Sequence, residues 1–394
     1  MTNDYQELKS ELGSELINIL KYWSENTLDY EHGGFLGKRN HYNEVVHKAS
    51  KGIILNARIL WSYSAASNHL KSNAYKLECD RAYHYLESYF RDKIYGGVYW
   101  ELSFSGKPIS VRKQVYAHSF AIYALVEYYL FSKNKDAKTW AIELFELLEK
   151  HAKDKVKLGY LEAFSENWDV IADMRLSEKD MNAAKTMNTH LHVLEAYTSL
   201  LKIYKNNELK KSLRDLVEIF LKKFLTPNNH YHLFFDEDWN LMSNSISYGH
   251  DIETAWLVIE AAKAIEDVEL LKNAQNIAIK VANTFLEEAI DNDGSVINEK
   301  NLTTNEIDYD RHWWPQVEAL IGLKYAYKIE PQKEYIKSSL AIWDYTKKNL
   351  IDKKNGEWHF RVNRNGNAYT EEDKVSMWKA PYHAVRACIL LNEN

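Results

Sequence analysis

Histidines gather where the sequence predicts helices to begin. The usual pKa of an imidazole lies near neutrality, so histidine can take up and return a proton at physiological pH. Each one alone is more often a packing or surface residue, and the 15 histidines of the chain would place several at helix starts by chance. Their gathering nevertheless indicates one site for proton transfer. The histidines concerned are His118, His190, His192, His250, His312 and His383.

The segment YGHDIETAW, residues 248–256, carries the strongest local signal. His250 and Glu253 are three residues apart and share a helix face, and Trp256 follows three residues later. A carboxylate beside an imidazole can fix its tautomer and raise its basicity. The competing interpretation is a helix cap followed by a buried tryptophan. Residue types alone leave both interpretations open.

Two further segments, MWKAPYHAVRAC and MNTHLHVLEAY, place histidines at helix starts. Pro381 is expected near the beginning of a helix, which puts His383 on the first turn. Asn188 and His192 are four apart and share a face, whereas His190 is offset by two. This spacing is not that of a histidine pair that binds a metal, and we predict no metal ion.

Other polar and aromatic residues stand in apolar helical segments. Arg58 lies in KGIILNARILW, and a buried arginine needs an anionic or hydrogen-bonding partner. Tyr116 begins a similar segment, and RHWWPQVEAL brings Trp313, Trp314 and Glu318 to the start of another. Such positions favour a binding site for a polar ligand.

Two alternating sets of helical segments must position these residues. The first set is amphipathic and rich in Lys and Glu, and the second is richer in Ala, Leu and aromatic residues. In the second set, each helical segment begins 62 to 68 residues after the beginning of the previous one. The first set covers about 5–24, 76–92, 136–153, 208–225, 268–288 and 334–349. The second covers about 49–67, 116–132, 184–204, 250–266, 312–328 and 379–392.

A short aromatic or glycine-marked stretch lies in each repeat and predicts a small strand or hairpin. These stretches are 33–40, 96–103, 159–166, 230–238, 294–301 and 356–363. Six units of outer helix, short strand and inner helix predict an all-α (α/α)6 barrel, one domain over residues 1–394. An open α-solenoid is the alternative, but its usual repeat of about 34–47 residues is shorter. In such a barrel the loops that enter the inner helices surround one cavity.

Composition narrows the class of protein. The formal charge is −6, without a basic stripe, so nucleic acid is not an expected partner. The charged N-terminus does not resemble a signal peptide, and no segment reaches the length of a membrane span. Two distant cysteines favour a reducing, cytoplasmic location. Nothing in the outer segments indicates an oligomer, and a monomer is favoured. Aromatic residues make up 13% of the chain, which core packing explains better than a carbohydrate surface.

The motifs GHDIETAW, MNTHLH, WWPQVE and WKAPYH, in order around a sixfold toroid, resemble cellobiose 2-epimerases of the N-acylglucosamine 2-epimerase superfamily. The resemblance extends from about residue 15 to residue 390. It implies an isomerase that reversibly epimerises C2 of the reducing-end glucose of β-1,4-linked disaccharides. It implies no metal or nucleotide cofactor, and an oligosaccharide as the substrate.

The resemblance also implies roles for individual residues. His250 and His383 match the two bases, and His192 matches the histidine that helps to open the sugar ring. The family's residues that bind or polarise the reacting end of the sugar correspond to Arg58, Tyr116, Asn188 and Glu253. An acid of the family's substrate site corresponds to Asp180. The aromatic side chains that hold the sugar in the family correspond to Trp313 and Trp378. We add Trp256 as a further substrate contact.

The chemistry of C2 epimerisation fits these roles. The C2 proton is acidic only while C1 is an aldehyde, so a group such as Arg58 with Tyr116 or His192 must polarise the C1 oxygen. A histidine suits proton removal near neutral pH, and a second one suits return of a proton to the opposite face. We therefore expect His250 and His383 to act through a cis-enediolate, with rotation about C2–C3.

Several alternatives stay open at this point. A glycoside hydrolase on the same barrel would need two spaced carboxylates, for which the candidates are Asp180, Asp251, Glu253 and Asp310. A non-catalytic carbohydrate-binding toroid would use the aromatic residues alone. Within the superfamily, an N-acylglucosamine 2-epimerase or a mannose isomerase would share the pair of bases.

Overall fold

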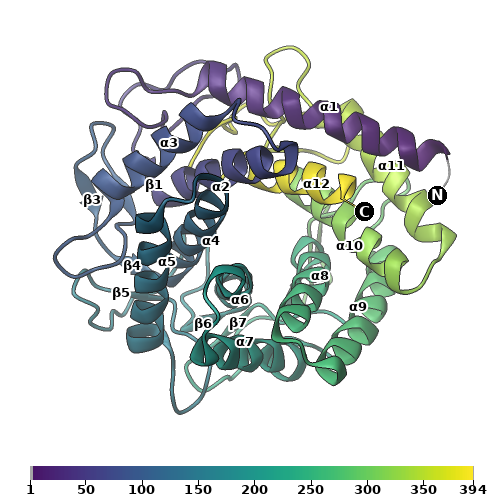
Figure 1. The fold of residues 1–394 in the computed structure, drawn as a ribbon. Coiled ribbons are helices and arrows are strands. Elements are labelled where there is room, and N and C mark those ends of the chain that lie inside the picture. Colours follow the sequence, from purple (N-terminus) through teal and green to yellow (C-terminus); the bar gives the residue numbers. More distant parts are fainter. Residues whose placement is uncertain (1–2, 394) are drawn as a thin grey trace.

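Helices form two concentric rings in this protein (Figure 1). The structure is a computed structural model, and it describes residues 3–393. Over these residues, six inner and six outer helices alternate along the chain, which confirms the predicted (α/α)6 barrel. The outer helices are α1 (Asn3–Asn26), α3 (Lys76–Tyr85), α5 (Lys135–Leu147), α7 (Asn207–Ile219), α9 (Val268–Glu288) and α11 (Lys333–Asn349). The inner helices are α2 (Ile53–Leu70), α4 (Val115–Ser132), α6 (Met187–Ile203), α8 (Tyr248–Ile265), α10 (Trp313–Ile329) and α12 (Tyr382–Asn392).

The inner ring is closed by contact between its first and last members. Each inner helix packs against the next, and α12 packs against both α2 and α1. In α2 every residue from Ile53 to Ser67 is buried, since outer helices and neighbouring inner helices surround it. A helix buried on all sides needs apolar residues all round rather than one apolar stripe. This explains why the inner segments lack a polar face in the sequence.

Three outer helices end in a π-helical turn of five residues: η1 (Leu86–Phe90), η2 (Leu148–Ala152) and η3 (Phe220–Phe224). These turns complete the outer segments that were predicted to end near residues 92, 153 and 225. None of the helices in residues 3–393 combines the length and apolarity needed to cross a bilayer.

Short strands join neighbouring repeats. The strand that enters an inner helix pairs, antiparallel, with a strand from the next repeat. A bridge between Arg39 and Val375 joins the first repeat to the last. The strands are β1 (Lys51–Gly52), β2 (Glu101–Leu102), β3 (Pro108–Ser110), β4 (Lys113–Gln114), β5 (Ala163–Phe164), β6 (Lys185–Thr186), β7 (Phe234–Phe235), β8 (Ser245–Ser247), β9 (Glu299–Asn301), β10 (Ile307–Asp308), β11 (Arg311–His312) and β12 (Arg361–Val362).

Five of the six stretches predicted as strands contain one, and the first, 33–40, contains isolated bridges at Phe35 and Arg39.

A repeated ion pair fastens the segment that leads into five of the six inner helices. A lysine or arginine just before an inner helix reaches an aspartate that opens the hairpin, and most of these side chains are buried. Because the aspartate also accepts backbone N–H groups of its own turn, it ties the hairpin to the helix start. The pairs are Lys51–Asp29 (2.6 Å), Lys113–Asp92 (2.5 Å), Lys185–Asp154 (2.7 Å), Arg311–Asp291 (2.5 Å) and Lys374–Asp352 (2.7 Å).

The fourth residue of several inner helices holds the neighbouring hairpin by a backbone hydrogen bond. Nε2 of His118 accepts from Val98 N at 3.1 Å, and Nε2 of His190 accepts from Tyr160 N at 2.9 Å. Asp251 and Gln316 accept the corresponding N–H groups in later repeats. His118 and His190 therefore support the fold. The expectation that all six histidines converge on one cavity is corrected for these two and for His312, which lines a different cavity.

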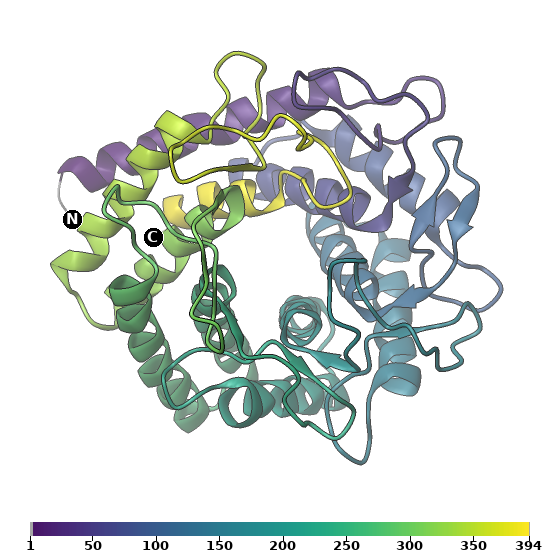
Figure 2. The ribbon, with the colours of Figure 1, turned by 180° about the vertical axis from the view of Figure 1, so that it is seen from behind.

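The two ends of the barrel differ. Connections from an outer to an inner helix span 23 to 34 residues, whereas those from an inner to the next outer helix span two to five. Figure 2 shows the end with the long connections, where the yellow-green segment before α12 lies over the inner helices. Candidate residues at inner-helix starts therefore lie under long loops.

Candidate active site

A cavity of about 160 Å³ lies at the end of the barrel where the inner helices begin. All six inner helices contribute to its wall, and two loop residues complete it. This wall brings together most of the residues selected from the sequence. It consists of Arg58, Tyr116, Asn188, His192, His250, Glu253, Trp313, Trp314, Phe360, Trp378 and His383.

Each of the three histidines in this wall has its Nδ1 atom bound. His383 Nδ1 lies 2.8 Å from Glu318 Oε1, and His192 Nδ1 lies 3.0 Å from Glu195 Oε2. His250 Nδ1 lies 2.9 Å from Ser247 Oγ. A partner at Nδ1 fixes the ring, so Nε2 is the nitrogen left for chemistry.

Burial keeps these histidines in the uncharged, basic form. It lowers the pKa of His250 to about 4. It also lowers the pKa of His383 well below its usual range, with Glu253 opposing the shift. The pKa of His192 is lowered by burial too, against the effect of Glu195. At neutral pH all three imidazoles can therefore accept a proton.

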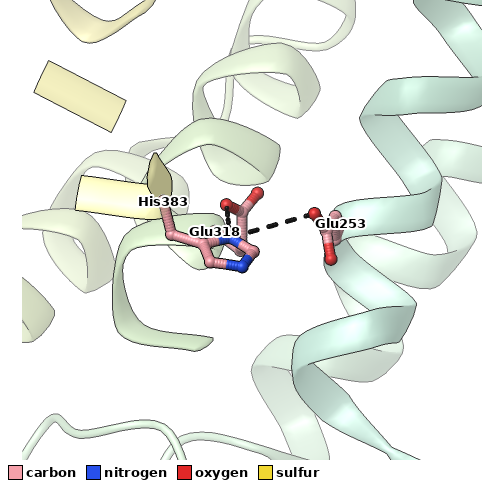
Figure 3. Close-up of side chains that lie close together, drawn as sticks. All are labelled: Glu253, Glu318 and His383. Carbon is pink, nitrogen blue, oxygen red and sulfur yellow. Dashed lines mark hydrogen bonds and ion pairs between the residues drawn. The ribbon is translucent and has the colours of Figure 1, made fainter. Parts of the chain in front are cut away.

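A buried arginine organises the carboxylates behind the histidines. Arg386 Nη2 lies 2.5 Å from Glu253 Oε1 and 2.7 Å from Glu318 Oε1, and Nη1 contacts Glu195. Figure 3 shows His383 with Glu318 and with Glu253, whose carboxylate oxygen is 4.0 Å from Nδ1. Burial would raise the pKa of Glu195, but Arg386 and His192 outweigh it and lower the pKa to about 2. Arg386 thus keeps negative charge on Glu195, beside His192. Burial raises the pKa of Glu318, and Arg386 opposes that rise.

Glu195, Glu318 and Arg386 were not among the residues selected as site residues. Their spacing gave a signal, since Glu195 is three residues after His192 and Arg386 is three residues after His383. Glu253, by its spacing, was a candidate partner of His250. It binds Arg386 instead, and the partner of His250 is Ser247.

Arg58 offers positive charge to the cavity. Its Nη2 donates to Tyr116 Oη at 2.8 Å and its Nη1 to the carbonyl oxygen of Trp378 at 3.4 Å. Its Nε is buried without a hydrogen-bond partner, and its guanidinium lies over the ring of Phe120 at 4.4 Å. Within residues 3–393 no carboxylate forms an ion pair with it. A buried cation with spare donors is suited to an oxygen that gains negative charge.

Two polar groups beside Arg58 complete this part of the wall. Burial raises the pKa of Tyr116 to about 12, with Arg58 opposing the shift, so the phenol keeps its proton and can donate. Oδ1 of Asn188 is buried and lacks a partner among the described residues. Both groups can bind hydroxyl or carbonyl oxygens of a ligand.

Trp314 lies against both candidate bases. Its ring centroid is 4.7 Å from that of His250 and 5.5 Å from that of His383. Trp313, chosen from the sequence as a platform, also lines the cavity but packs on Phe360 at 4.8 Å. Trp378 closes another side, 6.1 Å from Tyr116. Trp314 therefore packs against both candidate bases, and it was not selected.

Two selected residues lie outside this cavity. Trp256 donates from Nε1 to Glu318 Oε2 at 3.1 Å and has Arg386 over its ring at 4.8 Å, so it supports the carboxylates from behind. Asp180 lines an adjoining cavity of about 500 Å³, whose wall shares Asn188 and His250. A ligand longer than one sugar ring could extend from the first cavity into the second.

One group of side chains in the described residues has the geometry of a metal site. Ligand atoms of Glu253, Glu318 and His383 all lie within 4.8 Å of one another. Arg386 contacts both of these carboxylates and supplies the positive charge that a metal ion would otherwise provide. The donor set therefore suits an arginine-centred network better than a metal ion.

Comparison with known proteins gives consistent matches over the whole chain. A cellobiose 2-epimerase of Bacteroides fragilis is 43% identical over 386 residues, which cover 98% of each chain. The solved structure of a sugar epimerase from a ruminal bacterium superposes with a TM-score of 0.93 at 36% identity, covering 98% of each chain.

The structure of cellobiose 2-epimerase from Bacillus thermoamylovorans gives a TM-score of 0.91 at 34% identity, covering 97% of this chain and 99% of that one. These likenesses confirm the expectation of an isomerase. The model of the N-acylglucosamine 2-epimerase family matches residues 34–387, and the chain belongs to that family.

Proposed function

We propose that the protein is a cellobiose 2-epimerase, which interconverts glucose and mannose at the reducing end of β-1,4-linked disaccharides such as cellobiose and lactose. One observation carries this proposal: two uncharged, buried histidines from different helices, His250 and His383, lie on the wall of one cavity together with Arg58. Relatives that bear this name, 43% and 37% identical, support the choice of substrate.

Ring opening is the first step. It moves the proton of the C1 hydroxyl to the ring oxygen, breaks the bond from C1 to that oxygen, and leaves an aldehyde at C1. We assign this transfer to His192, whose Nδ1 is held by Glu195 and whose ring lies edge-on to Tyr116 at 5.0 Å. A histidine so fixed can both accept and donate the proton.

Removal of the C2 proton follows. One histidine takes it, and the electron pair of the C–H bond forms the C1–C2 double bond of a cis-enediolate while the C1 oxygen gains negative charge. Arg58 and Tyr116 stabilise that oxygen by hydrogen bonds in a site shielded from water. The spare Nε donor of Arg58 is available for the same purpose.

Return of a proton to the other face completes the reaction. After rotation about C2–C3, the second histidine passes a proton taken up from solvent to C2, and the double bond returns to an aldehyde, which closes to the epimeric sugar. The first histidine then releases the proton that it removed to solvent. His250 and His383 come from α8 and α12, which are not neighbours in the inner ring, so they can reach the intermediate from two directions. Either histidine can begin, depending on the epimer that binds.

Hydrolysis on the same barrel fits the carboxylates less well. Asp251 is held by His230 Nδ1 at 2.8 Å and by a backbone N–H, and Asp310 is paired with Arg361 at 2.8 Å. Glu253 is engaged by Arg386. Asp251 and Asp310 thus serve structural contacts, whereas a hydrolase needs two carboxylates that flank the scissile bond.

Product analysis tests the proposal. The protein is incubated with cellobiose in D2O with a chelator and without nucleotide, and products are resolved by chromatography and NMR. We expect glucosyl-mannose of unchanged connectivity carrying deuterium at C2. Free glucose would indicate a hydrolase, and cellobiose recovered without exchanged hydrogen would indicate a binding protein.

Parallel incubations separate the alternatives within the family. Lactose is expected to give epilactose, and N-acetylglucosamine and mannose to react at least tenfold more slowly than cellobiose. A preference for either monosaccharide would replace the proposed substrate. We also infer a cytoplasmic monomer, for which the two buried, unpaired cysteines Cys79 and Cys388 are consistent with a reducing compartment.

A further inference from the structure

A separate cavity lies at the other end of the barrel, and we propose that it binds a small neutral polyhydroxyl ligand, that is, a sugar or polyol. Its volume is about 390 Å³, more than twice that of the first cavity. This is within the range of roughly 300–1,000 Å³ that is typical of small-molecule sites. We call it the distal cavity. The proposal stands whether or not the protein epimerises cellobiose.

The distal cavity is built from the later turns of the inner helices. Trp61, Tyr123, Ser199, Trp256, Tyr325 and Arg386 represent all six of these helices in its wall. The turns at this end are short, between two and five residues, so long loops do not cover it. Figure 1 shows this end, with the C-terminal part of α12 nearby. A ligand could therefore enter independently of the first cavity.

Three buried polar atoms in this wall have no hydrogen-bond partner in the described residues. They are Nε1 of Trp61, Oγ of Ser199 and Nε of Arg386, from side chains that are 5%, 2% and 1% exposed. Buried polar atoms are normally satisfied, because leaving one without a partner costs free energy. Their gathering around one hollow space indicates that a polar molecule completes the site.

Aromatic rings form two facing walls. Trp61 stacks on Tyr123 at 5.1 Å with planes 21° apart, and Trp256 packs on Tyr325 at 5.7 Å. The first pair comes from α2 and α4, and the second from α8 and α10, which lie on opposite sides of the inner ring. Flat aromatic walls of this kind suit the C–H faces of a sugar ring.

The polar atoms without a partner in the wall of the distal cavity indicate the chemical class of its ligand. Trp61 Nε1 and Arg386 Nε are donors and need an acceptor oxygen, which an ammonium ion does not have. The wall also holds four carboxylates and two cations, so its net negative charge disfavours an anion. The carboxylates, among them Glu127 and Glu260, accept hydrogen bonds from hydroxyl groups. A hydroxyl group both accepts and donates, unlike an ammonium ion or a sulfate ion. A neutral polyhydroxyl compound satisfies both kinds of partner.

Methyl β-glucoside is the probe, since its anomeric carbon is locked and it cannot be epimerised. Binding is measured by calorimetry, and its place by a crystal structure of the soaked full-length protein. Thr198→Trp fills the distal cavity from a partly exposed position of its wall. Thr139→Trp, at an exposed position of α5, is the matched control, because both hydroxyls bond the carbonyl four residues earlier.

We expect sugar density in the distal cavity of the wild type, and binding there at least tenfold weaker in Thr198→Trp but unchanged in Thr139→Trp. Trp61→Phe keeps the ring and removes the donor, so distal binding should weaken by three- to tenfold. Trp378→Ala, which alters the first cavity and lies outside the wall of the distal one, should retain the distal molecule. Trp61→Phe decides the question if Thr198→Trp does not fold.

Three results would overturn the proposal. Density for ordered water alone at saturating probe would make the distal cavity a solvent pocket. Occupation by cyclohexylammonium or sulfate in place of the glucoside would assign it to a different ligand class. Binding that survives Thr198→Trp and disappears in Trp378→Ala would belong wholly to the first cavity.

Discussion

Nδ1 of His383 lies 2.8 Å from Oε1 of Glu318, although 65 residues separate them in the chain. The carboxylate is in turn bound by Arg386 at 2.7 Å and by Trp256 at 3.1 Å. Glu318 therefore orients the imidazole and leaves Nε2 as the nitrogen for the proposed proton transfer. A carboxylate that holds the tautomer of a catalytic histidine also stabilises the imidazolium that forms during the reaction.

Replacing this carboxylate tests the arrangement. In Glu318→Gln the amide keeps the shape but loses the charge, and we expect kcat to fall by roughly 10² to 10⁴ with KM changed less than threefold. Steady-state kinetics with cellobiose gives both constants. Glu306→Gln, at an exposed position, is the control. A loss confined to KM would mean that Glu318 acts in binding rather than in orienting His383.

The two proposed bases make a second prediction. His250→Ala and His383→Ala should each lose at least roughly 10³-fold in kcat, because general base catalysis by a positioned histidine contributes about 10² to 10⁴ and each turnover needs both. Circular dichroism should show the wild-type fold. The control variant His84→Ala, at an exposed position of α3, should keep the wild-type kcat. A near-normal rate in either test variant would remove that histidine from the mechanism.

Deuterium exchange separates the two histidines further. With mannose-ended and glucose-ended disaccharides in D2O, a variant that lacks one base can still remove the C2 proton from the epimer facing the remaining base. Exchange without net epimerisation is therefore expected for one epimer in each variant. Exchange lost for both epimers in both variants would argue against a separate base for each face.

Periodicity in the sequence predicted the barrel well, because inner helices that are buried on all sides must be apolar all round. The starts of α4, α8 and α10 differ by at most two residues from the predicted ones. The site residues that share a helix turn, such as Asn188 and His192, could likewise be grouped from their spacing.

Contacts between distant helices could not be predicted in this way. Spacing along α8 suggested that Glu253 would pair with His250, but Arg386, 133 residues away, binds Glu253 instead. Local spacing shows which side chains share a face, and only the packing of the inner ring decides which faces meet. The same limit applies to Trp256, whose helix face pointed to the site but whose indole lies behind it.

Trp256 leads to a third prediction, which distinguishes support from substrate contact. Trp256→Phe keeps the ring under Arg386 and removes the hydrogen bond to Glu318. We expect kcat to fall roughly tenfold, in keeping with the loss of one hydrogen bond to a charged group, with KM within twofold of the wild type. Initial rates over a range of cellobiose concentrations measure both. A large rise in KM at unchanged kcat would instead indicate direct contact with the sugar.

The histidines that hold hairpins give a prediction about stability at acid pH. Burial lowers the pKa of His118 to about 3 and that of His190 to about 4, below the value of about 6.5 in an unfolded chain. Between these values the unfolded chain binds protons that the folded chain does not. The free energy of unfolding should therefore fall as the pH drops from 7 to 5, by up to about 2 kcal/mol for each histidine.

Gln316 shows how to remove this dependence, since it holds its hairpin at the same helix position without titrating. In His118→Gln combined with His190→Gln, the difference in free energy of unfolding between pH 7 and pH 5 should shrink by up to about 4 kcal/mol. Urea titrations at the two pH values measure it, with the exposed His84→Gln as the control. Neither histidine lines the first cavity, so the double variant should keep its kcat at pH 7. An unchanged pH dependence would show that these two imidazoles are not the groups through which acid destabilises the barrel.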